Sequence, residues 1–465
     1  MANGWLGLNT ALSGLRTAQQ MLDISAHNIA NVSTPGYSRQ RAHLVAAPPF
    51  SFPAFNRSGL PGQLGTGVMI SSIDRIRDVY LDQQINDQTA LTGYWGARND
   101  VLATAESVFP EPSNTGLGNE LSKFWSSWED LAANPSSSAA RMAVLTQATS
   151  LAARFNRDAS QLTTQISGVD SQVRGAIADA NDLATQIAAL NKQIQGIEIS
   201  GDHANDLKDQ RDQLVQQLNA IAPTQTVQQP DGTMTVLIGG TAIVDHENVM
   251  AMTAVNDASG HAVPTWSTGM TVDLKGGKLQ AYIEARDVTL TGYMGKLNQL
   301  AQQIADQVNT AHQSGVDANG VAGLALFTYA PGSDASTLAV NAALGNDPSR
   351  VVVAASAGAP GDTSIASQIA DLATSATFGT GAQTPTDAYA SFIGQIGADA
   401  KQANEMQINQ SLVQTELENR RSSISGVSLD EEATDVIRFQ QAYQASAKVI
   451  TTINEMLDTL INRMI

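Results

Sequence analysis

The chain has 465 residues, and its 26 Lys and Arg side chains against 44 Asp and Glu side chains give a formal net charge of −18. Nucleic acids and anionic membranes are bound by clustered Lys and Arg, so this acidity argues against both as partners. Cysteine is absent, which excludes disulfides, thiolate metal sites and cysteine nucleophiles. No apolar run approaches about 18 residues, and no basic segment precedes an apolar one at the start, so neither a membrane span nor a cleaved signal peptide is predicted.

The first 36 residues predict an amphipathic helix that ends in a turn at Pro35 and Gly36. Apolar and small side chains recur there at alternating spacings of three and four, which is typical of a coiled-coil seam. The seam comprises Trp5, Leu8, Leu12, Leu15, Gln19, Leu22, Ala26 and Ile29. Arg16 and Asp23 are the only charged side chains before the turn. A lone helix this poor in charge is marginally stable and needs a partner.

The middle of the chain is mainly helical in pattern. Helices are predicted over 118–133, 139–156, 162–197, 205–222, 290–311 and 386–423, and each is interpreted as part of a bundle core. The stripe of Phe124, Trp125, Trp128 and Leu131 is likewise interpreted as core and not as a ligand site. Residues 314–385 are rich in Gly, Ala, Ser and Asp, so long loops with short strands or helices are expected there.

Residues 224–281 break the helical pattern. The run TQTVQQPDGTMTVLI predicts two strands around a turn, because Pro fixes φ and Gly supplies a positive φ. Alternation at period two also marks 249–255 and 270–274. A small β domain is therefore expected over 223–281, with boundaries at Pro223 and at Gly276–Gly277.

The last segment repeats the pattern of the first. Ser428 and Glu431 fit a capping box, and the acidic first turn suits the positive end of a helix dipole. The seam runs through Leu429, Ala433, Val436, Gln440, Tyr443, Ala447, Ile450, Asn454, Leu457, Ile461 and Met464. Two such helices at opposite ends of one chain most simply pair with each other. Gln19, Gln440 and Asn454 are polar seam positions of the kind that fix register.

No catalytic, metal or cofactor site is predicted. No two of the six histidines lie closer than 15 residues, and neither a Walker A loop nor a G-x-S-x-G elbow occurs. The glycines of GQLGTG at 62–67 are interpreted as a turn, and Asp317 and Asn319 lack the remaining ligands of a calcium loop. The carboxylate pairs Asp206/Asp209 and Glu416/Glu418 are interpreted as solvated helix faces.

The turn after the first helix carries a resemblance. Ala30, Asn31, Thr34, Pro35, Gly36 and Tyr37 match the A-N-x-x-T-P-G-Y-like signature of the flagellar rod, hook and hook-associated protein family. The following Ser38-Arg39-Gln40 resembles the hook-associated branch, as do the C-terminal run from SGVSLDEEATDVIRFQQ onwards and the internal DLAANPSSSAARMAVLTQATSLAARFN. Longer members carry a further outer domain, for which this chain has room only at 223–281.

The resemblance implies a structural subunit without enzymatic activity that self-assembles at the distal end of the hook and joins hook to filament. The partners it implies are further copies of the chain, hook protein, a second hook-associated junction protein, an export chaperone on the C-terminal region and the flagellar type III export apparatus. Neither a cofactor, nor nucleic acid, nor membrane insertion is expected. The protein would be cytoplasmic before export and extracellular, in the flagellum, afterwards.

The expected fold is mainly α, an elongated bundle of long antiparallel helices with an inserted β domain, whose N- and C-terminal helices pair as a rod. Three parts are expected: a terminal assembly segment (1–36 and 426–465), an α-helical domain (37–222 and 282–425) and the β domain (223–281). The terminal segment is expected to be disordered in the monomer, because its apolar stripes lack neighbours there. The assembly interface is predicted at Trp5, Leu8, Leu12, Leu15, Gln19, Leu22, Ile29, Leu429, Val436, Gln440, Tyr443, Ile450, Asn454, Leu457, Ile461 and Met464.

Three alternative functions remain open at this point. A hook or distal-rod protein would share the terminal motifs but is disfavoured by Ser38-Arg39-Gln40. A secreted type III effector or translocator would also be acidic and helical, although a translocator should carry an apolar membrane hairpin. A peptidoglycan hydrolase would need a carboxylate pair in a cleft.

Overall fold

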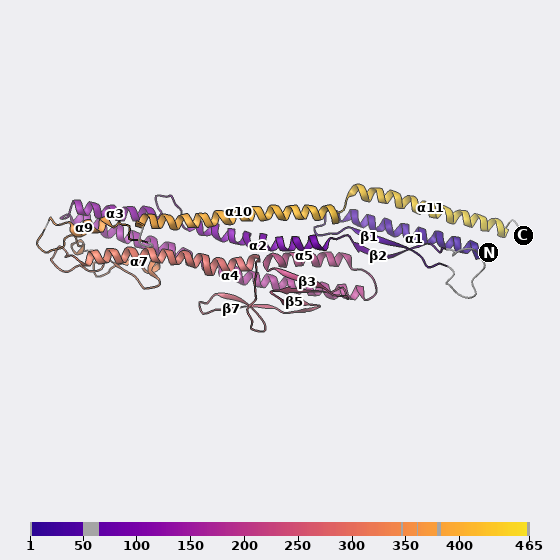
Figure 1. Ribbon diagram of the computed structural model, residues 1–465, viewed down its shortest axis with the longest axis horizontal. Coiled ribbons are helices and arrows are strands. Elements are labelled where there is room, and N and C mark those ends of the chain that lie inside the picture. Colours follow the sequence, from indigo (N-terminus) through magenta and orange to yellow (C-terminus); the bar gives the residue numbers. More distant parts are fainter. Residues whose placement is uncertain (1, 50–64, 346, 360, 379–382, 463–465) are drawn as a thin grey trace.

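Long helices run along the length of the molecule, which is much longer than it is wide (Figure 1). This computed structural model describes residues 2–49, 65–345, 347–359, 361–378 and 383–462. At the two ends of the chain, side chains are described from residue 6 onwards and up to residue 459. The predicted fold class, mainly helical and elongated with small sheets, is confirmed. Within the described ranges, no helix is both long enough and apolar enough to cross a membrane.

The body of the molecule is a bundle built around α4 (Ser138–Glu198), a single helix of 61 residues. The predicted helices 139–156 and 162–197 are parts of it, because nothing between them breaks the helical hydrogen bonding. Its neighbours include α2 (Val79–Val108), α3 (Leu117–Ala133), α5 (Asn205–Ile221), α6 (Gly277–Glu284), a π-helical turn (Ala285–Leu290) and α7 (Thr291–Gln313). The last helix of the body, α10 (Pro385–Ser425), packs on α2, α3 and α7. α10 lies beside α2 for much of its length (Figure 1).

The core of the bundle consists of two clusters that follow one another along α4. The first lies where α3, α7 and α9 (Ser364–Asp371) meet α4, and Phe124, Trp128 and Leu131 are fully buried in it. The interpretation of the Phe124–Leu131 stripe as core is therefore confirmed. The second cluster joins α4 and α5 to the β domain through residues such as Ile187 and Val236.

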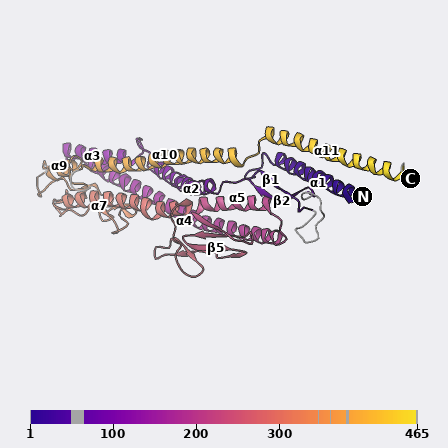
Figure 2. The same ribbon diagram turned by 45° about the vertical axis from the view of Figure 1, so that its right-hand side comes forward.

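The β domain sits on one flank of α4 (Figure 2). Its main sheet is antiparallel, with β3 (Thr224–Gln228), β4 (Met234–Ile238), β5 (Thr241–Asp245) and β6 (Asn248–Val249) in that spatial order. A second pair is formed by β7 (Met252–Asn256) and β8 (Ala262–Trp266). The predicted hairpin around Pro230–Gly232 is confirmed. Residues 270–274 form no strand, and Thr271 makes only a single bridge to Thr265.

The far end of the bundle is closed by the loop-rich segment. Within the described parts of 314–385 it contains β9 (Phe327–Thr328), α8 (Asp334–Thr337), β10 (Ala339–Val340), a 3-10 turn (Pro348–Arg350) and α9. Long loops with short elements were predicted here and are observed. Buried His312 at the end of α7 connects two of these loops, because it bonds the carbonyl of Leu324 and the amide of Val352.

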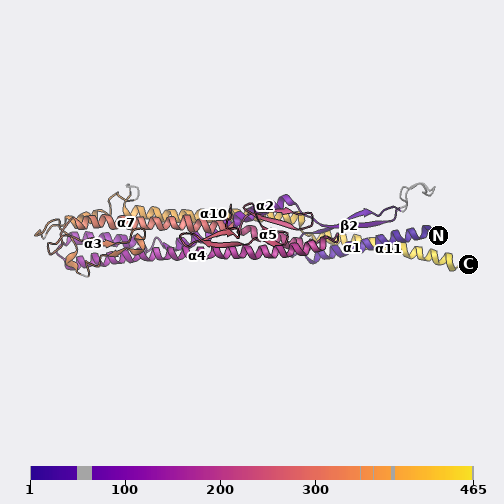
Figure 3. The same cartoon turned by 90° about the horizontal axis from the view of Figure 1, so that it is seen from below.

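The two ends of the chain form an arm that extends from the opposite end of the bundle. We use "arm" for α1 (Ala2–Ala30) and α11 (Leu429–Asn462), which pack together along their lengths in opposite directions. A hairpin of β1 (Gln40–Ala46) and β2 (Val68–Arg75) runs beside α1 (Figure 3). The predicted pairing of the terminal helices is thus confirmed.

Candidate assembly interface

The two arm helices approach each other closely because small side chains line their contact. A Cβ atom on Gly7 would lie 3.4 Å from Cδ1 of Ile453, and one on Gly14 would lie 3.1 Å from Oγ of Ser446. Ala11 and Ala18, on the same face of α1, are buried. Positions 7, 11, 14 and 18 follow the four–three spacing of a coiled-coil seam.

This contact face of α1 lies one residue before the predicted seam. The predicted positions flank it instead: Leu8, Leu12, Leu15, Leu22 and Ile29 are half-buried, whereas Gln19 and Ala26 are exposed. Spacing alone does not distinguish the two registers, because both repeat every seven residues. The prediction favoured the large side chains, but small ones permit the closer approach. Trp5 was predicted for the seam, and its side chain lies outside the described residues.

On α11 half of the predicted seam takes part in the contact. Val436, Ala447, Ile450 and Leu457 are half-buried there, and Glu432, Phe439, Ser446 and Ile453, which each lie one residue before a predicted position, are buried or half-buried beside them. The predicted positions left exposed are Leu429, Ala433, Gln440, Tyr443 and Asn454. Gln19, Gln440 and Asn454 are therefore outside this contact, and the expectation that they fix its register is not met. Ile461 and Met464 have no described side chain.

α11 carries large apolar side chains that are about half exposed, and one of them, Val449, also lines a cavity shared with α1. Ile437, Val449 and Met456 are 57%, 48% and 59% exposed. Sequence analysis missed all three, because they lie off the seam. Between α1 and α11 there is also a cavity of about 670 Å³, and its lining, which includes Thr10 and Ala445, contains no charged side chain. The arm therefore exposes apolar surface to water as long as no partner covers it.

The family-like turn forms the joint between arm and body. Asn28 is buried at the end of α1, donates from Nδ2 to the carbonyl of Gln40 at 3.0 Å and accepts from its amide at 3.0 Å. The Tyr37 hydroxyl donates to Oδ1 of Asn28 at 2.8 Å. Burial and the carboxylates of Asp206, Asp209 and Glu432 raise the pKa of Tyr37, so its hydroxyl stays protonated as the donor that this bond needs.

The rest of the predicted motif shapes the turn itself. Asn31 donates from Nδ2 to the carbonyl of His27 at 3.0 Å, and Thr34 donates to Oδ1 of Asn31 at 3.1 Å. Gly36 has a φ of 79°, a left-handed conformation that a side chain would strain. Pro35 and Gly36 are exposed. The motif residues therefore define the path of the chain after α1.

Carboxylates of α5 hold the base of the hairpin. Asp209 accepts from the amide and the hydroxyl of Ser38, each at 2.8 Å, and from Arg75 at 2.7 Å. Arg75 and Arg77 also donate to Asp212, at 2.9 and 2.6 Å. Asp209 is 5% exposed, so the interpretation of Asp206/Asp209 as a solvated pair is wrong for Asp209. Its partners come from segments more than 130 residues away in sequence, which spacing does not reveal.

Arg39 faces the first turn of α11. It donates to Glu432 and to Glu431, each at 2.6 Å, and lies 3.7 Å from Asp435. Glu432 is 2% exposed, and Arg39 is the partner that bonds its buried carboxylate. α11 begins at Leu429 as predicted, directly after Ser428, but the carboxylate of the predicted capping residue Glu431 accepts from Arg39. Sequence analysis used Arg39 as a branch marker and assigned it no contact.

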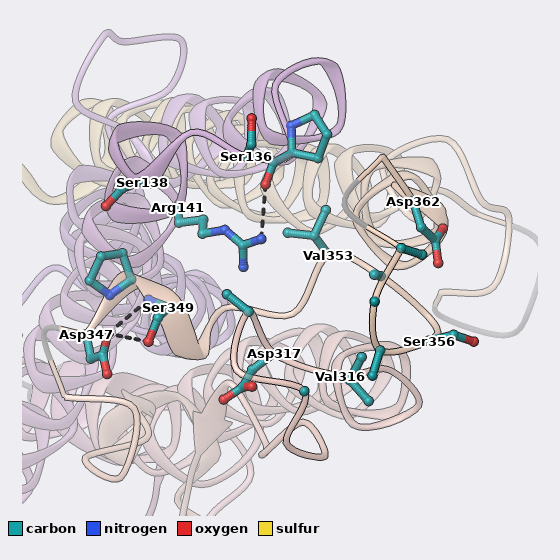
Figure 4. Close-up of a pocket in the computed structure, with 18 residues that line it drawn as sticks. Ser136, Ser138, Arg141, Val316, Asp317, Asp347, Ser349, Val353, Ser356 and Asp362 are labelled. Atoms are coloured by element: carbon teal, nitrogen blue, oxygen red, sulfur yellow. Dashed lines mark hydrogen bonds between the residues drawn. The ribbon is translucent and has the colours of Figure 1, made fainter.

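No catalytic arrangement is found in the described residues. They contain no group of three or more His, Asp or Glu side chains placed to hold a metal ion. A cavity of about 780 Å³ at the loop-rich end is crossed by Arg141, which donates to the carbonyls of Pro135 and Val351 (Figure 4). The Asp317 and Asp347 carboxylates beside it cap backbone amides of their own loops.

Known protein families match three parts of the chain. Residues 102–327 match the family described as "Flagellar hook-associated protein FlgK helical domain". Residues 418–464 match "Flagellar basal body rod FlgEFG protein C-terminal", and residues 8–37 match "Flagella basal body rod protein". The two ends thus match rod proteins and the bundle matches a hook-associated protein. Together they define a structural protein of the axial part of the bacterial flagellum.

Whole-chain relatives specify the family further. The chain is 30% identical to flagellar hook-associated protein 1 of Bacillus subtilis over 100% of its own length and 99% of that protein. The protein of the same name from Escherichia coli is 27% identical over 98% of the chain and 99% of that protein. The chain belongs to the flagellar hook-associated protein 1 family. The family is structural, so the chain is not an enzyme.

A solved structure shares the fold. The flagellar hook junction protein FlgK of Burkholderia pseudomallei superposes with a TM-score of 0.67 at 16% identity, over 74% of this chain and 100% of that one. This likeness concerns the fold, and the expected resemblance to the hook-associated branch is confirmed by the whole-chain relatives and the family match.

Proposed function

We propose that the chain self-assembles at the distal end of the hook and forms the junction between hook and filament. The observation that carries this proposal is the arm, a pair of terminal helices in which α11 leaves Ile437, Val449 and Met456 about half exposed. Subunits of a tube or ring meet through unlike surfaces, so such faces are covered by neighbouring subunits. Membership of the hook-associated protein 1 family places this assembly in the flagellum.

We further propose that the arm becomes ordered when neighbours cover it. Its helices comprise 29 and 34 residues, and fixing a backbone costs about 1–2 kcal/mol per residue. A large apolar side chain contributes about 1.5–3 kcal/mol when it is fully buried. Within the described part of the arm, Phe439 is the one large apolar side chain below a tenth exposed. The contact between α1 and α11 therefore stabilises the arm too little to keep it folded in the free subunit. Because a disordered arm offers no assembly surface, free subunits do not polymerise prematurely.

The division of the chain follows from the same proposal. Residues 1–36 and 426–465 assemble, the helical domain of 37–222 and 282–425 supports them, and the β domain of 223–281 faces the outside of the tube. The predicted seam residues left half-buried or exposed, among them Leu8, Leu12 and Tyr443, contact neighbouring subunits.

The proposed partners are hook protein on one side and a second hook-associated junction protein on the other. A dedicated chaperone holds the C-terminal region before the flagellar type III apparatus exports the chain, and the protein then resides outside the cell. Family membership supports this route.

The test changes the exposed apolar side chains of the arm. The triple variant I437D/V449D/M456D places charges where neighbours would pack, so binding to isolated hooks should fall at least about tenfold. Sedimentation of hooks with bound protein measures it. The matched control is V227D/V255D/M270D, which changes side chains 49%, 50% and 59% exposed on the β domain. The control should bind hooks normally, and undiminished binding by the arm variant would contradict the proposal.

A further inference from the structure

Two adjacent residues at the joint bind opposite parts of the molecule. Ser38 bonds Asp209 of α5 through both its amide and its hydroxyl, at 2.8 Å each. Arg39 bonds Glu431 and Glu432 of α11, at 2.6 Å each. The segment leads directly into β1, and consecutive side chains of an extended chain point to opposite sides. One residue therefore faces the body and the next faces the arm.

The body half of this contact rests on several segments. β1 and β2 pair Gln40 with Arg75, and Arg75 donates to Asp209 and Asp212 beside Arg77. Asn205 donates to the carbonyl of Ile73 at 2.7 Å. Asp209 and Asp212 belong to α5, which packs on α4 and α2. Ser38 therefore binds a part of the molecule that the bundle core holds in place.

The α11 side of this contact rests on one guanidinium. Arg39 binds two carboxylates of the first turn of α11, and Glu432 is buried at that point. The backbone of Arg39 adds two bonds, since its amide donates to the carbonyl of Ser425 at 2.9 Å and its carbonyl accepts from the amide of Ile76 at 2.8 Å. Ser425 is the last residue of α10, and α11 begins at Leu429. Arg39 thus spans the break between the two helices.

We propose that Ser38 and Arg39 are the positioning residues that fix the direction of the arm relative to the body. The side-chain contacts that link arm to body here are ionic and polar, and the two core clusters of the bundle contain no residue of α1 or α11. On the α1 side, His27 lies 3.3 Å from Asp206 of α5 and Asn28 bonds Gln40. On the α11 side, the direction depends on the Arg39 pairs, with Ser38 as their anchor on α5. The proposal assigns a role within the proposed assembly function, but its test needs no hooks.

The test keeps the arm paired in the free chain with an introduced disulfide. A Cβ atom on position 14 would lie 4.0 Å from Cβ of Ser446, within the range of about 3.5–4.5 Å that disulfides span. The chain has no other cysteine, so Gly14→Cys with Ser446→Cys forms the single bridge. Arg39→Gln is then compared with Arg41→Gln, a control that removes the same charge from an exposed position two residues later. A third chain exchanges the charges, with Arg39→Glu combined with Glu431→Arg and Glu432→Arg.

Two measurements report the direction of the arm. In the bridged Arg39→Gln chain, amides at 38–40 and 429–435 should exchange with deuterium at least about tenfold faster than in the bridged parent. Small-angle X-ray scattering should show a spread of maximum dimensions in place of the single value that a fixed arm gives. Body amides should be unchanged. The Arg41 control should match the bridged parent, and the charge-exchanged chain should recover both readouts, which a general loss of stability would not allow.

Three results would overturn the proposal. The first is an Arg39→Gln chain that keeps its protection and its dimension, and the second is a charge-exchanged chain that stays as open as Arg39→Gln. The third is failure of the bridge to form, because the pairing of α1 with α11 is a premise. None of these results depends on hook binding, so the assembly function is judged separately.

Discussion

At the scale of single residues, the structure uses buried polar groups to tie distant segments together. His312 is fully buried beside Trp128, and both of its ring nitrogens are occupied. Nδ1 lies 2.5 Å from the carbonyl of Leu324 and so carries the proton, while Nε2 accepts from the amide of Val352 at 3.0 Å. Only the neutral ring can make both bonds. Burial accordingly lowers the pKa of His312 to about 4.

This histidine makes stability depend on pH. The unfolded chain binds a proton near pH 6.5, whereas the folded chain does so only near pH 4, so stability is complete above about pH 6.5 and falls as pH drops towards 4. The expected loss is about 3 kcal/mol. Asp158 acts in the opposite sense, because burial raises its pKa to about 6 and protonation then favours the folded state. Urea unfolding of the full chain measures the sum of the two effects.

A variant separates them. His312→Gln keeps a polar side chain but does not titrate, so its stability should lack the His312 contribution between pH 7 and pH 4. The difference in unfolding free energy between parent and variant should shrink by about 3 kcal/mol over that range, with the Asp158 contribution common to both. A difference that stays constant with pH would contradict the neutral buried ring.

At the scale of elements, the sequence predicted those whose apolar residues repeat on one face. α3, α5, α10 and the first hairpin of the β domain lie within a few residues of their predicted bounds. α2 was missed, although it has 30 residues. Its buried side includes Gln88, Thr89 and Gly93 as well as Leu81 and Ile85, so its packing face is not a stripe of large apolar residues.

Glycine in α2 illustrates why that face escaped prediction. A Cβ atom on Gly93 would lie 2.3 Å from the carbonyl oxygen of Ala220 in α5, so this glycine is what allows the two helices to touch. Gly93→Ala should therefore destabilise the body by roughly 1–3 kcal/mol through overpacking. Gly168→Ala is the matched control, since it lies in α4 with open space around it, and it should stabilise by roughly 0.5–1 kcal/mol. Denaturant unfolding measures the free energy of unfolding of both variants. Equal changes in the two variants would contradict the close contact between Gly93 and α5.

The assembly interface was predictable in part. The pairing of the two ends followed from matching seams and low charge, which the structure bears out. The register of this pairing did not follow from the sequence, because Gly7 and Gly14 carry no hydrophobic signal while Leu8 and Leu15 do. The joint was recognised as a motif, but the bonds of Ser38 and Arg39 reach α5 and α11, which lie about 170 and 390 residues away. Contacts of that range depend on the complete fold.

At the scale of the whole molecule, three parts differ in what stabilises them. The bundle has continuous apolar cores, and the β domain is fastened to α4 by buried Arg286, which donates to Asp170 at 2.6 Å and to the carbonyl of Ala262 at 2.9 Å. The arm has a narrow contact of small side chains, and several apolar side chains of α11 remain exposed. A stable body with a poorly covered arm suits a subunit that folds before it assembles and completes its folding on its neighbours.

Hydrogen exchange with mass spectrometry tests that division most directly. The full chain is measured alone and after binding to isolated hooks, with the bundle helix α4 as an internal reference. We expect amides of residues 1–36 and 429–465 to exchange freely in the free protein and to become protected on hooks, while α4 is protected in both states. Arms that are already protected in the free protein and do not respond to hooks would contradict this division.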